Sequence, residues 1–508
     1  MFLRIQGSIF AGVCLLWLLF SPTVGAVPLQ NREATAHAQL PGALNEAEKL
    51  GAAIVTTGSA HTQSPAGIPP GWLAIPFVVL LLMIATGPLL YAKFWHRHYP
   101  KVAILLAALV LAYYLLVLHD WAKPVAALME YIQFIALIAA LYMAAGGILV
   151  EINKRATPFT NLGLLLIGAI IANLIGTTGA SMLLIRPYMR LNQGRVRVYH
   201  IVFFIFIVSN VGGALTPIGD PPLFLGFLSG VPFFWTLQHN LMPWLVALLL
   251  LGTSFYCLDT YNVSHTAQAS IDPTKPTLYL VGKHNFIWFA VIIGAVFIDP
   301  NLFDGVPALR YNHHSFSFVR ELILFAVAWL SYRYADRYAL QENAFSLAPL
   351  KEVTMLFVGI FGTMIPVLQL ISAFASSEAG RAIITHNTLY WGAGIFSSLL
   401  DNAPTYLNFG AASMAAHGAD ITMVADVKAF AAGGVFANSV LQLKAISIAS
   451  VFFGAMTYIG NGPNFMVKVI AEHLGLRMPS FFTYIFRFSL PILLPVLIIV
   501  WLLFFASL

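Results

Sequence analysis

The sequence predicts an all-α polytopic membrane protein of about ten transmembrane helices, with two re-entrant hairpins and two discontinuous helices in an inverted repeat. Three observations lead to this fold class: the composition, the length of the apolar runs, and two interruptions within them. Of 508 residues, 59% are hydrophobic and 9% are charged, whereas roughly 25% are charged in an ordinary soluble domain. The apolar residues come in runs of about 20, the length that spans a bilayer. The lipid bilayer is therefore an expected partner.

The N-terminal segment, residues 1–26, has the features of a signal peptide. Arg4 precedes an apolar core from Ile9 to Phe20, and small residues follow at Val24, Gly25 and Ala26, which is the usual order of such a segment. The alternative is an uncleaved first helix. Residues 27–70 are predicted to be an extracytoplasmic linker, and residues 71–508 the membrane transporter domain.

The basic residues predict the orientation of this domain. The net charge of +6 is interpreted as a topology signal and not as a nucleic-acid footprint, because lysine and arginine collect in short cytoplasmic loops. Most of them face the cytoplasm if the first span runs inward. The predicted spans cover residues 72–92, 102–118, 125–150, 198–228, 241–259, 285–299, 317–332, 353–374, 444–470 and 482–507.

Two further apolar stretches do not fit as crossings. Residues 159–189 have basic residues on both flanks, so both ends should lie on the cytoplasmic side, with a turn at Gly176–Gly179. Residues 388–413 have few basic flanking residues and contain Asp401-Asn402-Ala403-Pro404 in mid-run. We expect two re-entrant hairpins, the first entering from inside and the second from outside.

Each predicted hairpin is followed by a span that is interrupted in its middle. The first interruption is SNVGGALTPIGDPP, residues 209–222, and the second is FFGAMTYIGNGPN, residues 452–464. Glycine and proline at this density break the helical hydrogen-bond ladder, and freed backbone groups at membrane depth are tolerated only inside protein or beside a polar cavity. One such break could be a proline kink, but two hairpin-and-break units indicate an inverted repeat, roughly residues 125–260 and 350–508, with a midplane binding site.

The candidate ligands are oxygen-bearing side chains at these hairpins and breaks, because sodium, like other hard cations, prefers oxygen. An ionised aspartate within a membrane is costly unless it is paired or solvated, and a carboxylate can hold either a proton or a cation. We therefore predict a sodium site at Asp220, Asn210, Asp401 and Asn402, and no cofactor. The remaining cation- or proton-binding candidates are Ser209, Thr216, Thr405, Thr177, Thr178, Ser181, Asn461, Asn464, Ser398 and Thr457. Glu130 and Glu151, near the ends of the third span, are expected to be interfacial, and a role in proton access is the alternative for Glu151.

The stretches SNVGGALTPIGDPPLFLGFLSGVPFFW and SSLLDNAPTYLNF resemble the NhaD-type sodium/proton antiporters, a branch of the ion transporter superfamily that also holds arsenite pumps and citrate or dicarboxylate carriers. The resemblance covers the chain from about Trp72 onward. It implies a homodimer and an elevator-like movement of a transport domain. The Ser-Asn-Thr hairpin motifs of the dicarboxylate branch are replaced here by Thr-Thr-Gly-Ala-Ser and Asp-Asn-Ala-Pro-Thr, which counts against carboxylate binding.

The function expected from these features is exchange of sodium, or lithium, for protons across the inner (cytoplasmic) membrane of a bacterium. The alternative is a symporter or exporter of a small anion such as citrate, dicarboxylate or arsenite. An intramembrane aspartyl protease using Asp220 and Asp401 is disfavoured, because Asp220 lies in Pro-Ile-Gly-Asp and hydrolysis needs no repeat framework. The protein is therefore not expected to be an enzyme, and the chain has no Walker-type loop for ATP.

Overall fold

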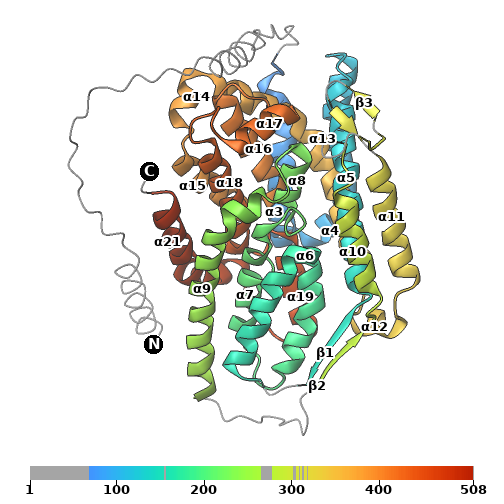
Figure 1. Cartoon of the computed structure of the whole chain (residues 1–508), viewed down its shortest axis with the longest axis vertical. Helices are drawn as coiled ribbons and strands as arrows, with labels where there is room; N and C mark the ends of the chain where they lie inside the picture. Colours follow the sequence, from blue (N-terminus) through green and yellow to red (C-terminus); the bar gives the residue numbers. More distant parts are fainter. Residues whose placement is uncertain are drawn as a thin grey trace, which may run out of the picture. The chain divides into compact units, whose positions relative to one another are not determined.

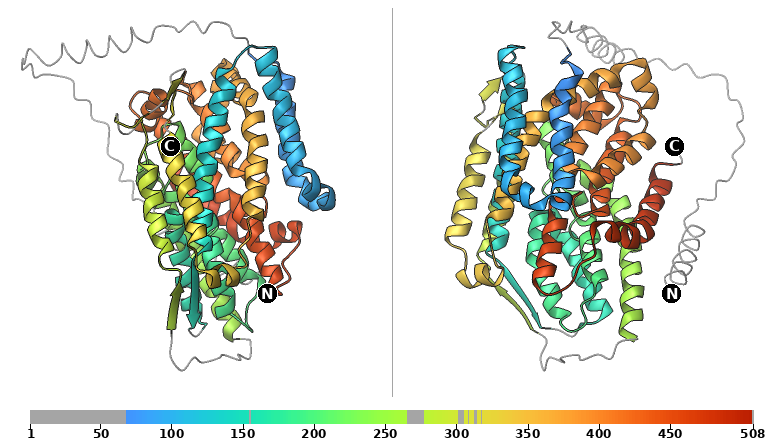
Figure 2. Two further views of the ribbon diagram at one scale, coloured as in Figure 1. Left: turned by 90° about the vertical axis from the view of Figure 1, so that its right-hand side faces the viewer. Right: turned by 180° about the vertical axis from the view of Figure 1, so that it is seen from behind.

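The computed structural model describes residues 68–153, 156–264, 277–300, 305–307, 309–311, 314–316 and 318–506. The predicted signal peptide and almost all of the predicted linker lie outside these residues. Pro69–Leu508 forms one compact unit, in which most helices run along the vertical axis of Figures 1 and 2.

The first half of this unit contains η1 (Gly71–Ala74), α3 (Ile75–Leu90), α4 (Ala92–Leu116), α5 (Ala122–Gly146), β1 (Leu149–Asn153), α6 (Pro158–Leu191), α7 (Val198–Ile207), η2 (Val211–Leu215), α8 (Pro221–Ser229), α9 (Trp235–Ser264) and β2 (Thr277–Val281). Next come α10 (Asn285–Val296), β3 (Leu309–Tyr311), β4 (His314–Phe316), α11 (Phe318–Arg333), α12 (Arg337–Glu342), α13 (Ala348–Ser376) and α14 (Glu378–Ile383). The last part contains α15 (His386–Leu399), α16 (Asn402–Ala416), α17 (Val424–Ala432), α18 (Ser439–Phe452), η3 (Phe453–Met456), α19 (Gly462–His473), α20 (Phe481–Tyr484), η4 (Ile485–Leu493) and α21 (Leu494–Phe504).

Helices long and apolar enough to cross a membrane dominate the unit, as predicted. Within the described residues there are 8 of them: Arg97–Leu116, Ala122–Gly146, Pro158–Leu191, Val198–Leu215, Trp235–Val263, Ala348–Ser376, Ser439–Met456 and Phe481–Phe504. Gly71–Ile84 and Asn285–Val296 are shorter apolar helices. Large apolar side chains such as Leu105, Phe286 and Trp329 are exposed, as expected of a surface that faces lipid.

Two short strand pairs accompany the predicted helices. Leu149–Asn153 pairs antiparallel with Thr277–Val281, and Leu309–Tyr311 pairs with His314–Phe316. The helix at the third predicted span, α5, ends at Gly146, and Glu151 lies beyond it in β1. The sequence did not predict the first pair for two reasons. Its strands are too short to show a clear alternation of apolar and polar residues, although they are rich in Val, Ile, Leu and Thr, and they lie far apart in the sequence.

The chain reverses direction within α6. Gly176 has φ 78° and ψ 154° inside the helical run, a conformation that glycine adopts without steric cost. A side chain there would also approach the Ile218 carbonyl oxygen at 3.3 Å. At the other end, the side-chain amides of Asn161 and Asn192 donate to each other at 2.9 and 2.8 Å. The two limbs of α6 therefore lie side by side, with a turn at the glycine that the sequence suggested.

A second reversal joins α15 to α16 at Leu400 and Asp401, which have extended backbone. The rings of Phe396 and Phe409 lie 5.7 Å apart across the two helices. Asp401 is the N-cap of α16, and its carboxylate accepts the amide hydrogen of Ala403 at 3.0 Å. Aspartate is a favoured residue at this position.

Both interrupted spans are broken where the sequence predicted, and the two breaks share a local design. Thr216 Oγ1 donates to the Asn173 carbonyl at 2.6 Å and accepts from the Gly219 amide at 3.1 Å. Thr457 Oγ1 donates to the Ser398 carbonyl at 2.6 Å and accepts from the Gly460 amide at 3.1 Å. Each threonine thus closes its own turn and joins it to the preceding hairpin.

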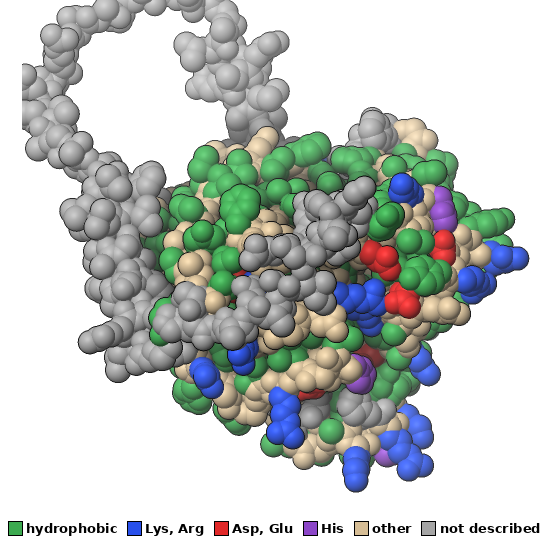
Figure 3. All heavy atoms as spheres, turned by 90° about the horizontal axis from the view of Figure 1, so that it is seen from below, with side chains coloured by type: hydrophobic (Ala, Val, Ile, Leu, Met, Phe, Trp, Pro, Cys, Tyr) green, Lys and Arg blue, Asp and Glu red, His purple; other side chains and the backbone are tan. Residues whose placement is uncertain are grey.

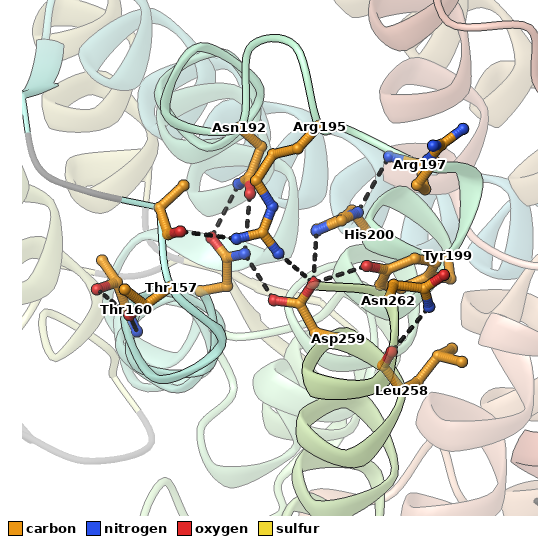
Figure 4. Close-up of polar contacts among 12 residues, drawn as sticks. Thr157, Thr160, Asn192, Arg195, Arg197, Tyr199, His200, Leu258, Asp259 and Asn262 are labelled. Atoms are coloured by element: carbon orange, nitrogen blue, oxygen red, sulfur yellow. Dashed lines mark hydrogen bonds and ion pairs between the residues drawn. The ribbon is translucent and has the colours of Figure 1, made fainter. Parts of the chain in front are cut away.

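A buried polar cluster holds the base of α6 to α7 and α9 (Figure 4). Its centre is Asp259, which is fully buried. Asp259 Oδ1 accepts hydrogen bonds from the Arg195 guanidinium and, at 2.6 Å, from the Tyr199 hydroxyl, and it lies 3.3 Å from His200 Nε2. Asp259 Oδ2 accepts from Asn161 Nδ2 at 3.0 Å. The carboxylate thereby joins three segments at one end of the unit.

Figure 3 views the unit from below Figure 1, where β1 and β2 lie, and shows lysine and arginine side chains spread over this end with hydrophobic side chains around them. Exposed basic residues of the loops predicted to be cytoplasmic include Arg190, Arg197, Lys283, Arg333 and Arg337. Arg190 forms an exposed ion pair with Glu342 at 2.6 Å. The cytoplasmic location of this end remains a prediction from the positive-inside rule.

Candidate functional site

Asp220 is the centre of the candidate site. It lies between the two halves of the first broken helix, at the N-cap of α8, but its side chain makes no capping hydrogen bond. The residue is 1% exposed. Asp220 Oδ1 accepts from Thr177 Oγ1 at 2.7 Å and from Asn461 Nδ2 at 3.0 Å, while Oδ2 accepts from Asn402 Nδ2 at 2.5 Å.

The three donors come from three other parts of the chain. Thr177 follows the Gly176 turn of α6, Asn402 is the first residue of α16, and Asn461 is the N-cap of α19. Both hairpin turns and both helix breaks therefore meet at one carboxylate. All three donors are neutral, and within the described residues no lysine, arginine or histidine forms an ion pair with Asp220.

A network of buried amides joins the two broken helices behind Asp220. Asn210 Nδ2 donates to Asn464 Oδ1 at 2.7 Å, and Asn461 Nδ2 donates to Asn210 Oδ1 at 3.2 Å. Asn464 Nδ2 in turn donates to the carbonyls of Gly454 and Thr457, at 2.8 and 2.9 Å. These bonds use backbone carbonyls that the second break frees from its helix.

The remaining predicted site residues lie near Asp220 or within the hairpins, but they donate no hydrogen bond to the Asp220 carboxylate. Ser181 and Ser209 share a hydrogen bond of 2.8 Å, beside the network but without contact to Asp220. Thr405 donates to the Asp401 carbonyl at 3.0 Å, and Ser398 donates to the Ile395 carbonyl at 2.7 Å, so both bond within their own hairpin. Thr178 lines the cavity described below.

Asp401 and Asn402 differ in what they contact, although they are adjacent. The Asp401 carboxylate is turned to the cap of α16, whereas the Asn402 amide reaches Asp220. Of the predicted sodium set, Asp220 and Asn402 are in direct contact, and Asn210 is joined to Asp220 through Asn461.

The position that matches Asp220 in the second break is Asn461, since TPIGDPP and TYIGNGP align residue by residue. This shared sequence pattern could have predicted that Asp220 and Asn461 occupy equivalent positions in the two breaks.

Sequence reasoning missed Asn173 as part of the site. Its side-chain Oδ1 accepts the amide hydrogen of Leu215 at 2.9 Å, and its carbonyl accepts from Thr216. Asn173 therefore joins the first hairpin to the first break at two points. A polar residue in the apolar run, one turn before Gly176, was the available indication.

A small cavity lies beside Asp220, with a volume of about 40 Å³, sufficient for a few water molecules or an ion. Its lining is provided by one face of α5, by the α6 turn and by the first break: Phe134, Leu137, Ile138, Leu141, Tyr142, Ile175, Gly176, Thr177, Thr178, Gly179, Pro217, Ile218, Gly219, Asp220, Pro221 and Phe224. Asp220 is the one charged residue in this lining, and none is basic.

One buried atom next to the carboxylate has no partner in the described part of the chain. Asn402 Oδ1 is buried and accepts no hydrogen bond, although the Nδ2 of the same amide contacts Asp220. An unpartnered buried carbonyl oxygen is costly. A carboxylate and an amide oxygen held together are also the ligand types that a hard cation prefers.

Apolar spans, two helix breaks and a buried carboxylate where they meet define a multi-pass membrane transporter and not an enzyme. The model of the family described as "Putative citrate transport" matches residues 67–505. The chain belongs to this family, which is part of the ion transporter superfamily, and it is a secondary transporter. No curated protein matches the sequence significantly. The predicted superfamily is therefore confirmed, while the NhaD branch remains a prediction.

Proposed function

We propose that the protein exchanges sodium, or lithium, for protons, and that Asp220 is the group at which the two cations compete. The observation that carries this proposal is a fully buried carboxylate that three neutral side chains hold and that no basic side chain neutralises within the described residues. A buried charge without a counter-ion is unfavourable. Binding of either a proton or a sodium ion neutralises the charge. Because one cation is sufficient, the two compete for the same carboxylate.

The side chains around Asp220 suit a sodium ion once it replaces the proton. Asp220 Oδ2 and the unpartnered Asn402 Oδ1 would supply two oxygens. Thr177 would supply a third through its hydroxyl oxygen after its hydrogen rotates away from Asp220. Rotation of the Asn461 amide would likewise exchange a donor for an acceptor. The same residues can therefore hold either cation without a change in backbone.

The arrangement of the chain supports a transport cycle of the kind proposed for inverted-repeat carriers. We propose that α6 and the α15–α16 pair are re-entrant hairpins that enter from opposite sides, and that residues 125–260 and 350–508 form the inverted repeat. The matching threonine bonds at the two breaks support this proposal. An NhaD-like homodimer in a bacterial inner membrane, made with a cleaved signal peptide, belongs to the same proposal.

Citrate transport is the second candidate, and two observations favour it. The family description names citrate. In addition, α8, α16 and α19 all begin beside Asp220, and helix N-termini attract anions. Against it, a tricarboxylate would meet the Asp220 carboxylate and a cavity lining without a basic residue. We therefore rank cation exchange first.

The test is a proton-flux assay in inverted membrane vesicles that hold a proton gradient. Sodium or lithium added outside is expected to release protons from the vesicles within seconds, whereas potassium and citrate are not. Vesicles without the protein provide the control. Proton movement on addition of citrate, with none on addition of sodium, would establish the second candidate instead.

The site also predicts a strong requirement for glycine at position 219. A Cβ atom there would lie 2.2 Å from the Gly213 carbonyl oxygen, so the backbone of the break must shift. Gly219→Ala should lower sodium-dependent proton flux by at least about tenfold, since misplacement of a binding group by an ångström is costly. In the second break, Gly462 has open space around its Cβ position, and Gly462→Ala should transport nearly normally. Equal flux in both variants would contradict the proposed role of the first break.

A further inference from the structure

Glu130 is a carboxylate within the membrane-spanning helix α5 that the site described above does not use. The α5 span covers Ala122–Gly146, which places Glu130 about 12 Å along the helix from its first residue. Phe134 and Leu141, at 4 and 11 residues further on, line the cavity beside Asp220. At roughly 100° per residue, all three lie within about 40° of one helical face. Glu130 is thus one turn, about 6 Å, beyond the edge of the cavity lining.

The lower part of this face packs against the first hairpin. A Cβ atom added at Gly176 would lie 3.6 Å from Leu141 Cδ1, and one added at Gly179 would lie 3.6 Å from Ala145 Cβ. Further up, Glu130 continues this face, whereas Gln133, which is 9% exposed, lies about 100° around the helix from Phe134. A glutamate on this face of an apolar helix is unusual for a surface that serves packing alone.

The Glu130 side chain has no ion-pair or hydrogen-bond partner among the described residues. It is partly buried, and it does not satisfy its charge through protein contacts. A carboxylate at this depth is retained only where water, a proton or a cation reaches it. The expected interfacial role does not account for a position on the same face as the cavity.

We infer that Glu130 is a second, water-accessible cation site on the α5 wall of the transport path, one helical turn beyond the cavity at Asp220. Its ligand class is a small monovalent cation, attracted by the single carboxylate. In the predicted orientation α5 begins on the outer side, so Glu130 would serve the passage between Asp220 and the outside. The assignment of sodium as that cation rests on the proposed function, whereas water access does not.

Thiol labelling tests water access without any assumption about the substrate. In a Cys14→Ser, Cys257→Ser background, Glu130→Cys and Leu128→Cys are treated in vesicles with a membrane-impermeant, cationic methanethiosulfonate. Leu128 is the matched control, since it lies at similar depth on α5 and is 52% exposed on another face. Glu130→Cys should react at least about tenfold faster than Leu128→Cys, because such reagents attack thiols that water reaches. Equal rates would overturn the inference.

Transport kinetics test the cation role in the wild-type cysteine background. Glu130→Gln should raise the apparent KM for sodium about threefold to fivefold with the maximal rate within about twofold, because it removes one attracting charge from the path and leaves Asp220 intact. Glu151→Gln, on β1, should leave both constants unchanged. An unchanged KM in Glu130→Gln would overturn the cation role. A wild type that moves no sodium would overturn the proposed function, and the labelling rates would then decide water access at Glu130 by themselves.

Discussion

Asp220→Asn is expected to abolish sodium-dependent proton movement, by at least about 100-fold, in a protein that still folds. The substitution removes the titratable charge but keeps the shape of the side chain. Asparagine Oδ1 can accept from Thr177 and Asn461, as Asp220 Oδ1 does. Its new amide would face Asn402, which can turn to present the oxygen that now has no partner. Folding should therefore survive while exchange is lost.

The informative controls are Asp220→Glu and Asp401→Asn. Asp220→Glu keeps a charge on a longer arm, so it should retain some exchange with an altered apparent affinity for sodium. Asp401 caps α16 through the Ala403 amide, and asparagine caps helices about as well. Asp401→Asn should therefore keep its flux within several-fold of the wild type. The reverse result, with exchange lost in Asp401→Asn and kept in Asp220→Asn, would move the coupling site to Asp401.

Asp259→Ala should be the most damaging substitution for stability. It leaves the Arg195 guanidinium without its carboxylate and removes the acceptor of Tyr199 and Asn161. Removal of one partner from a buried ion pair costs roughly 3–5 kcal/mol. The measurement is the midpoint of thermal unfolding in detergent. The loss is expected in the presence and absence of sodium, because the cluster is separate from the Asp220 hydrogen-bond network.

Arg190→Ala provides the comparison for that experiment. Arg190 also forms an ion pair, with Glu342, but its side chain is 42% exposed and that of Glu342 is 38% exposed. Exposed pairs contribute roughly 0–1 kcal/mol, so this substitution should hardly change the unfolding midpoint. Similar losses in Arg190→Ala and Asp259→Ala would show that burial of the pair is not what matters.

The sequence predicted the positions of the two helix breaks well because their causes are local. Gly212, Gly213 and Gly219 lie close to Pro217, Pro221 and Pro222, and glycine and proline at this density disfavour a continuous helix. The turn of α6 at Gly176 is similarly marked by a glycine that takes a positive φ. In these cases the residue type and the backbone conformation are directly linked.

The contacts of the site could not be predicted in the same way, because they depend on side-chain direction and on long-range pairing. Asp401 and Asn402 are neighbours with similar side chains, and the first turn of α16 decides which of them reaches Asp220. Asp259 and Arg195 are separated by 64 residues in the sequence. Five helical segments lie between β1 and β2 along the chain, although the two strands pair. No local pattern records such partners.

The most direct measurement for the central claim is sodium-induced proton release from the purified protein in weakly buffered detergent solution, over a series of pH values. If a proton and sodium compete for Asp220, sodium should release up to about one proton per chain from the wild type, and none from Asp220→Asn. Potassium and citrate should release none. Equal proton release from the wild type and from well-folded Asp220→Asn would contradict the account.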